Sequence, residues 1–137
     1  MTVNTPSPQQ PLDELLAAAP ETAAYWQAAA EGRLLLRRCE ACGRSHHYPR
    51  PICPHCGSDR TAWRAASGQG TIHTFSVMRR IDEPYAIGYV DLAEGCRMLT
   101  QFVDAEPDAL RIGAPVQVAF RDLGQGYPVP VFHPAAA

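Results

Sequence analysis

Four cysteines in two C-x-x-C pairs are the side chains of this sequence best suited to chemistry. Cys39 and Cys42 form the first pair, Cys53 and Cys56 form the second, and ten residues separate the pairs. Each pair turns two thiolates toward one point within a tight loop, and two such loops facing each other complete a tetrahedral S4 site. The spacing therefore predicts one metal ion held by four cysteines.

The residues around the pairs support a closed site. Gly43 and Gly57 each follow the second cysteine of a pair. Because glycine adopts positive φ without strain, the chain can turn away there and direct backbone N–H groups at the sulfurs. Three nearby histidines, His46, His47 and His55, could substitute as ligands, but four thiolates already saturate the site. We therefore expect the histidines to be solvated loop residues.

Other uses of the cysteine pairs fit the sequence less well. A redox C-x-x-C normally opens a helix in a βαβ context, which surrounds neither pair. Disulfides need an oxidising compartment, and residues 1–12 lack the basic and apolar regions of a signal peptide. Iron is the serious rival, because tetrahedral thiolate geometry suits both metals. We expect one structural zinc ion and keep iron as the alternative.

The size and hydropathy of the chain indicate one modest domain with a small appendage. A chain of 137 residues is too short for two full domains, and no apolar run approaches the roughly 20 residues that span a bilayer. We expect a cytoplasmic protein with no membrane partner. The fifth cysteine, Cys96, lies beside a turn, where a lone thiol is more often structural than nucleophilic.

The net charge of −2 conceals an asymmetry along the chain: residues 1–32 carry −4, residues 33–64 carry +5 and residues 65–137 carry −3. Arginine matches phosphate geometry with paired hydrogen bonds, so the basic stretch suits a phosphate-bearing ligand. A solvated surface balanced by the acidic N-terminus is the alternative. The arginines of the stretch are Arg33, Arg37, Arg38, Arg44, Arg50, Arg60 and Arg64.

The segment before the cysteines is predicted to be helical. Residues 1–11 are rich in Pro, Ser, Thr and Gln, and we expect them to be disordered. One short helix fits residues 13–19, and a second fits residues 21–31 between a proline and a glycine. Tyr25 and Trp26 make the second helix aromatic, so it needs a surface to cover, supplied by the chain itself or by a partner.

Two kinds of strand pattern follow. Residues 33–38 lead into the first cysteine pair and residues 61–64 can return antiparallel, which gives a zinc ribbon that metal binding helps to fold. From residue 68 onward apolar residues alternate, with a break in register after Ile72 that predicts a β-bulge. Strands are expected at residues 70–78, 85–91, 97–103, 115–121 and 129–132, and the aromatic side chains Phe75, Tyr85, Tyr89, Phe102 and Phe120 are expected mostly in the core.

Five short strands with no long helix between them suggest a small Greek-key barrel of the OB-fold type. The predicted fold class is therefore mainly β: an N-terminal helix, a C4 zinc ribbon, then a five-stranded OB-fold barrel. The expected organisation is a disordered N-terminus at residues 1–11, a helical segment at 12–32, a rubredoxin-like ribbon at 33–66 and the barrel at 67–133.

A run of motifs connects these elements: Tyr25-Trp26, Gly32-Arg33-Leu34, Arg38-Cys39-x-x-Cys42-Gly43, Pro49-Arg50-Pro51-x-Cys53-Pro54-x-Cys56-Gly57-Ser58, Trp63 and Ser67-Gly68-x-Gly70-Thr71-Ile72. With these motifs the chain resembles the zinc-ribbon/OB-fold proteins known as domain of unknown function 35. The resemblance covers nearly the whole chain from about Pro20, and all four metal positions are present.

The resemblance implies a role as a partner subunit. Members of that family accompany thiolase-superfamily enzymes, namely thiolases, aldolases or acyltransferases of lipid and sterol metabolism, and some are fused or bound to MaoC-like hydratases. In such assemblies the barrel is thought to help bind or channel acyl-CoA. The family offers no established catalytic residues, so none is assigned. The leading function is a non-catalytic accessory subunit of an acyl-CoA-processing complex.

An acyl-CoA ligand would bring phosphates for arginine and an acyl chain for an apolar barrel mouth. The candidate contacts are Arg37 and Arg38, just before the first cysteine pair, and Arg79 and Arg80, at the end of the first barrel strand. Each of these is weighed against plain surface charge, which is the more common role of paired arginines.

Two other functions stay open. Zinc ribbons and OB-folds also bind single-stranded nucleic acid, but a groove that tracks phosphates should be basic, whereas the barrel segment is acidic. An independent enzyme would need chemistry that the motifs do not offer, since there is no serine elbow, phosphate loop or H-E-x-x-H. A closed C4 site also has no open position to activate water, and His73 or His133 has no visible partner as a base.

Overall fold

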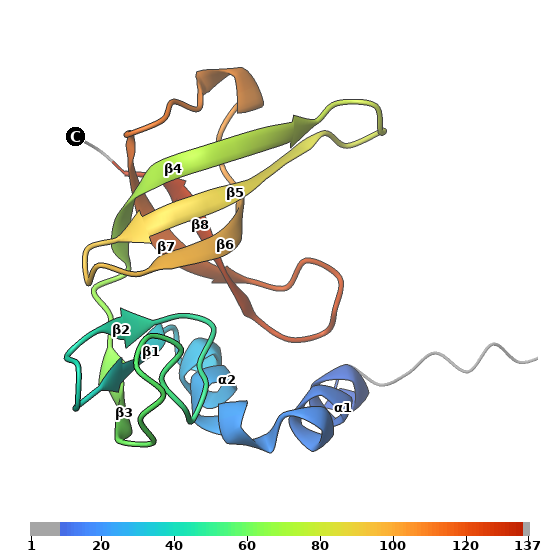
Figure 1. Cartoon of the computed structure of the whole chain (residues 1–137). Helices are drawn as coiled ribbons and strands as arrows, with labels where there is room; N and C mark the ends of the chain where they lie inside the picture. Colours follow the sequence, from blue (N-terminus) through green and yellow to red (C-terminus); the bar gives the residue numbers. More distant parts are fainter. Residues whose placement is uncertain (1–8, 136–137) are drawn as a thin grey trace, which may run out of the picture.

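The computed structural model describes residues 9–135, with side chains from residue 12 onward. Two helices precede a small three-stranded sheet, and a closed five-stranded barrel follows (Figure 1). The mainly β fold class predicted from the sequence is confirmed. The expectation of disorder at residues 1–8 lies outside the described residues, whereas residues 9–11 form the first turn of helix α1, Gln9–Ala18.

The N-terminal segment bends at a proline and then covers the chain's own core. Turn η1, Pro20–Thr22, separates α1 from α2, Ala23–Ala30. The hydroxyl of the buried Thr22 donates to the Ala19 carbonyl at 2.7 Å, which fixes the bend. Tyr25 of α2 is only 3% exposed and belongs to the hydrophobic core, so the surface that this helix needs is supplied by the rest of the chain.

The ribbon is a three-stranded sheet in the order β2-β1-β3. Strand β1, Leu35–Cys39, pairs antiparallel with β3, Thr61–Ala65, as the sequence predicted. Strand β2, Ser45–His46, pairs with the other edge of β1. Strand β2 was not predicted from the sequence, because two residues are too few to show an alternation of apolar and polar side chains.

The barrel closes in the strand order β4-β5-β6-β8-β7, the Greek-key order of an OB-fold. Its ladders are antiparallel except for the parallel contact of β6 with β8 at Phe102 and Phe132. The register of β4 against β5 shifts between Ile72 and Thr74, so the predicted bulge is confirmed and His73 is its extra residue. The strands are β4, Gln69–Met78; β5, Tyr85–Leu92; β6, Arg97–Phe102; β7, Pro115–Arg121; and β8, Val129–Pro134.

One core runs from the N-terminal helix through the ribbon into the barrel. Tyr25 and Leu36 belong to the same buried cluster as Val90 and Phe132. Since no break in packing separates the parts, the boundaries at residues 32 and 66 stay predictions about how the chain is organised. No helix in the described part of the chain is long and apolar enough to cross a membrane.

The three phenylalanines expected in the barrel core follow the prediction, whereas the two tyrosines of β5 do not. Phe102 is buried, and Phe75 and Phe120 pack against the core. Tyr85 is half-buried and lies outside the core cluster, and Tyr89 is 45% exposed. Strand alternation identifies which side chains share a face but not which face is inside, and the inner face of β5 carries smaller residues.

Candidate metal centre

The four cysteines of the ribbon converge on one point. Their Sγ atoms all lie within 4.8 Å of one another, with Cys39 and Cys56 3.5 Å apart and Cys42 and Cys53 3.8 Å apart. A tetrahedral zinc–thiolate site, with Zn–S bonds of about 2.3 Å, requires sulfur–sulfur separations of about 3.8 Å. The arrangement therefore fits a tetrahedral metal ion with no room for a fifth ligand from the protein.

Two equivalent turns build the site. The Gly43 amide donates to the Cys39 carbonyl and the Gly57 amide to the Cys53 carbonyl, both at 2.9 Å. Both glycines have positive φ, +76° and +78°, as the sequence predicted. Within each turn one backbone N–H points at a sulfur, from Cys42 to Cys39 Sγ and from His55 to Cys53 Sγ, each at 3.4 Å. The backbone thus stabilises negative charge on the sulfurs before any metal binds.

The electrostatics of the cluster favour a cation. The Cys42 N–H lowers the pKa of Cys39 to about 6, so this thiol readily becomes a thiolate. The Ser58 N–H has the same effect on Cys56, but the Cys39 sulfur, burial and the other two sulfurs outweigh it and raise that pKa to about 12. Four thiols at this spacing therefore cannot all be deprotonated in the absence of a cation. A divalent cation removes the conflict, because it stabilises all four thiolates together.

The loop between the cysteine pairs carries one buried and one half-buried histidine, whereas the sequence interpretation had both solvated. His46 is 2% exposed, and its Nε2 lies 3.2 Å from the Arg50 carbonyl oxygen. His47 Nε2 lies 3.0 Å from the Tyr25 hydroxyl, and burial lowers its pKa to about 4. The loop folds back against α2, a long-range contact that local sequence does not show. His55 is exposed, as expected.

The arginines proposed to contact acyl-CoA fall in two places. Arg37 donates to the Thr61 hydroxyl at 2.8 Å, and its guanidinium lies 4.7 Å from the centre of the Trp63 ring. Its neighbour Arg38 is exposed on the same strand. Arg37 therefore braces the ribbon sheet, while Arg38 is available to solvent.

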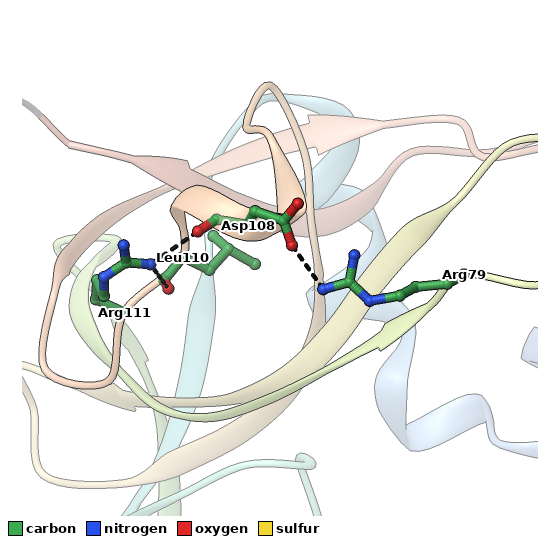
Figure 2. A network of polar contacts seen from close by, with 4 residues as sticks. All are labelled: Arg79, Asp108, Leu110 and Arg111. Carbon is green, nitrogen blue, oxygen red and sulfur yellow. Dashed lines mark hydrogen bonds and ion pairs between the residues drawn. The ribbon is translucent and has the colours of Figure 1, made fainter.

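The second arginine pair lies at the far end of the barrel. Arg79 forms a 2.6 Å ion pair with Asp108 in turn η2, Pro107–Ala109 (Figure 2). The backbone there is held by Arg111, which donates to the Asp108 and Leu110 carbonyls at 2.8 Å (Figure 2). Arg80 is exposed beside it.

The two arginine pairs are far apart in space, because the ten-residue strand β4 begins beside the ribbon and ends just before Arg79. At about 3.3 Å per residue this strand is about 33 Å long, and the loop that follows it extends away from the ribbon (Figure 1). One phosphate group cannot bridge both pairs, so the acyl-CoA assignments stay predictions about two separate contacts.

A charged row that sequence reasoning missed lies across three strands. His73 Nδ1 is 3.3 Å from one oxygen of Asp91, and Arg97 Nε donates to the other oxygen at 2.6 Å. The Arg97 contact holds the pKa of the Asp91 carboxyl below its usual range. His73 therefore has a carboxylate partner. The sequence alone could not show this pairing, because it depends on the bulge and on the cross-strand register, and Asp91 is distant from His73 along the chain.

Cys96 lines a cavity of about 590 Å³ between the ribbon and the turn joining β5 to β6. Its side chain is 9% exposed, and burial raises its pKa to about 11. A buried neutral thiol is a poor nucleophile, in keeping with the structural role expected for this residue.

The sequence matches two family models in succession. "ChsH2, rubredoxin-like zinc ribbon domain" matches residues 26–62, and "ChsH2, C-terminal OB-fold domain" matches residues 63–121. A "DUF35 domain-containing scaffold protein" of Methanothermobacter thermautotrophicus is 37% identical over 93 residues, which cover 63% of this chain and 70% of that protein. The chain belongs to the DUF35 family.

Other relatives carry the names of enzyme subunits. A "Probable enoyl-CoA hydratase alpha subunit" of Thermomonospora curvata is 36% identical over 82% of this chain, which spans only 37% of that relative's length. "Benzoylsuccinyl-CoA thiolase subunit BbsA" of Thauera aromatica is 28% identical over 75% of this chain and 78% of its own length. A chain of the solved "Ltp2-ChsH2(DUF35) aldolase" superposes with a TM-score of 0.72 at 35% identity, covering 84% of this chain and 94% of that chain.

Proposed function

We propose that this chain is a non-catalytic accessory subunit of an acyl-CoA-processing complex, in which a thiolase-superfamily enzyme carries the chemistry. The observation that carries the proposal is its similarity, over 84% of its length, to a chain of the Ltp2-ChsH2(DUF35) aldolase. The names of relatives as a scaffold protein, a thiolase subunit and a hydratase subunit support the same role.

The site chemistry is consistent with a subunit that does not catalyse. The four cysteines complete a tetrahedral set, so a bound metal has no open position for water or substrate. We propose that Cys39, Cys42, Cys53 and Cys56 hold one zinc ion. When bound, zinc supplies folding free energy by tying the two cysteine turns together. The chain's own contribution is the pair of glycine turns that orient the sulfurs.

We assign the acyl-CoA contacts of this subunit to Arg38 and Arg80 rather than to their neighbours. Arg37 is engaged with Thr61 and Trp63, and Arg79 is paired with Asp108. No ion pair with Arg38 or Arg80 occurs among residues 9–135. An arginine without a carboxylate partner has its full set of donors available for a phosphate.

The test is affinity purification of the tagged chain from its native cells, followed by mass spectrometry of the bound proteins. The expected result is a thiolase-superfamily enzyme in stoichiometric amount, with a MaoC-like hydratase as a further component. Recovery of nucleic acid or its processing proteins, without an acyl-CoA enzyme, would overturn the proposal. The tagged Cys39→Ser variant is a useful comparison, because loss of the ribbon should reduce capture of a specific partner.

A further inference from the structure

The first half of strand β5 carries small residues toward the inside of the barrel and large apolar ones toward the outside. The inward positions hold Ala86 and Gly88, whereas the outward positions hold Ile87 and Tyr89, which are 40% and 45% exposed. Space explains the inner residues, because a Cβ on Gly88 would lie 2.0 Å from the Thr74 carbonyl oxygen. Ile87 and Tyr89 therefore each leave about two-fifths of their surface uncovered by the fold.

Strand β6 shows the same arrangement at one pair of positions, whereas Met98 and Phe102 on its inner face are buried as usual. Thr100 points inward and is 6% exposed, with its hydroxyl 3.4 Å from the Pro130 carbonyl oxygen. Leu99 points outward and is 56% exposed. A soluble barrel would ordinarily place the leucine inside and the threonine outside, because burying an apolar side chain is favourable and burying a hydroxyl is costly. Leu99 therefore adds an exposed apolar side chain to the outer face of the barrel beside those of β5.

The two strands align these residues into one patch. Tyr89 and Leu99 are directly opposed, and Ile87 lies two residues away on the same face. The next pair along, Asp91 with Arg97, is ionic. We define the docking face as Ile87, Tyr89 and Leu99. An apolar centre beside a polar row is the anatomy of a protein–protein interface, where the rim stays wet and the centre is desolvated.

The docking face continues into a hollow of about 430 Å³ between α2, the ribbon loop and the barrel. Tyr89 and Leu99 form one wall of it, and Trp26 and Tyr48 lie on the other side. The exposed surface of the docking face and Tyr48, polar atoms included, is on the order of 400 Å², a size at which largely apolar patches on single chains are often functional. This is about half of what one partner buries in a standard interface, so the patch would be the centre of a larger contact.

The charge around the docking face and the closed barrel indicate which class of molecule can bind there. Strands β5 and β6 correspond to the second and third strands of the OB-fold. In OB-folds the outer face of these two strands is the usual ligand surface, together with the loops that follow the first and fourth strands. A nucleic acid would require free cations there. Among the described residues that line the hollow, the one arginine, Arg97, is already paired with Asp91. The described barrel is closed, so a partner also has no free strand edge to extend and must bind through side chains.

We propose that the docking face binds an apolar surface of the thiolase-superfamily subunit. This proposal rests on the proposed function and adds the surface that performs it. Truncating or charging the centre of such a face should weaken binding strongly, because central, fully desolvated residues carry most of the affinity of an interface.

The test compares Leu99→Glu with Ile112→Glu. Ile112 is 71% exposed in the connection between η2 and β7, outside the docking face, so it is a matched apolar-to-acid control. The enzyme captured by the wild-type chain and identified as a thiolase-superfamily member is purified, and its affinity for each variant is measured by biolayer interferometry. We expect at least a thirtyfold loss of affinity for Leu99→Glu and less than a twofold change for Ile112→Glu. Circular dichroism and metal content must match the wild type.

Each outcome decides the proposal. If Leu99→Glu binds the enzyme as tightly as the wild type, the docking face is wrong while the proposed function stands. If the wild-type chain captures no such enzyme, the proposed function fails and the docking face with it. Light scattering tests whether the free chain forms a dimer, and fluorescence anisotropy tests whether it binds nucleic acid. A dimer, or binding of a 20-nucleotide oligothymidylate, that is abolished by Leu99→Glu would reassign the face to a second copy or to nucleic acid.

Discussion

Each cysteine of the ribbon supplies one corner of the S4 site, so replacing one should disable the whole site. Cys39→Ser is expected to lose the bound metal and to become sensitive to protease between residues 39 and 60, because metal-binding free energy is folding free energy in a small ribbon. Metal content by mass spectrometry and limited proteolysis measure both effects. Cys96→Ala is the control, since Cys96 is not among the four clustered sulfurs and should leave metal content unchanged. A metal-free Cys39→Ser that resists protease would refute the structural role.

A second prediction at this scale concerns His47 and pH. Because burial lowers its pKa to about 4, below the ordinary value of 6.5, the unfolded chain binds this proton more readily than the folded one. Stability should therefore be constant above about pH 6.5 and fall as the pH drops from 6.5 toward 4, by up to about 3 kcal/mol. Urea unfolding of the wild type and His47→Gln across this range isolates the effect from acid release of metal, which both share. Parallel pH profiles for the two proteins would count against it.

At the scale of elements, the strands β4 and β5 approach closely at Gly88. A Cβ there would lie 2.7 Å from the Phe75 Cα as well as against the Thr74 carbonyl, so Gly88→Ala must push the strands apart. We expect a loss of unfolding free energy of about 2–3 kcal/mol or more, as in other overpacked cores. Gly95→Ala is the comparison. It introduces a side chain into open space at φ +95°, so only backbone strain of about 1 kcal/mol is added. Equal effects of the two substitutions in chemical denaturation would argue against the close approach.

The strands also show which parts of the fold could be predicted from the sequence. Local patterns sufficed for most strands: β1 and β3 were predicted from their place beside the cysteine pairs, and the barrel strands and the bulge at His73 from the run of apolar residues. The cysteine spacing likewise sufficed for the convergence of four sulfurs. What it could not supply was non-local: the two-residue strand β2, the burial of His46 under the returning loop, and the pairing of His73 with Asp91. The outward direction of Tyr89 belongs with these, because alternation has no preferred face.

At the scale of the whole molecule, the parts form one body with distinct surfaces. A continuous core joins α2, the ribbon and the barrel, and the exposed arginines Arg38 and Arg80 lie toward opposite ends of it. The docking face lies on the barrel wall, on β5, which pairs with β4, and on its other neighbour β6. A partner bound there would therefore leave both ends of the chain available to a ligand that also contacts the partner.

Substitutions at Arg38 and Arg80 distinguish a scaffold, which only holds the enzyme, from a subunit that contributes to the substrate site. In the complex reconstituted from this chain and its thiolase-superfamily partner, Arg38→Ala or Arg80→Ala should raise KM for acyl-CoA about tenfold if the arginine binds a CoA phosphate, because a charge-assisted hydrogen bond to phosphate contributes about 1.5 kcal/mol. The value of kcat should change little, since the arginine would not touch the reacting atoms. Arg64→Ala, an exposed arginine on β3, is the control for a general loss of positive charge. Steady-state kinetics at fixed ionic strength distinguish the cases: unchanged constants for both variants would make this chain a scaffold that holds the enzyme without contacting its substrate.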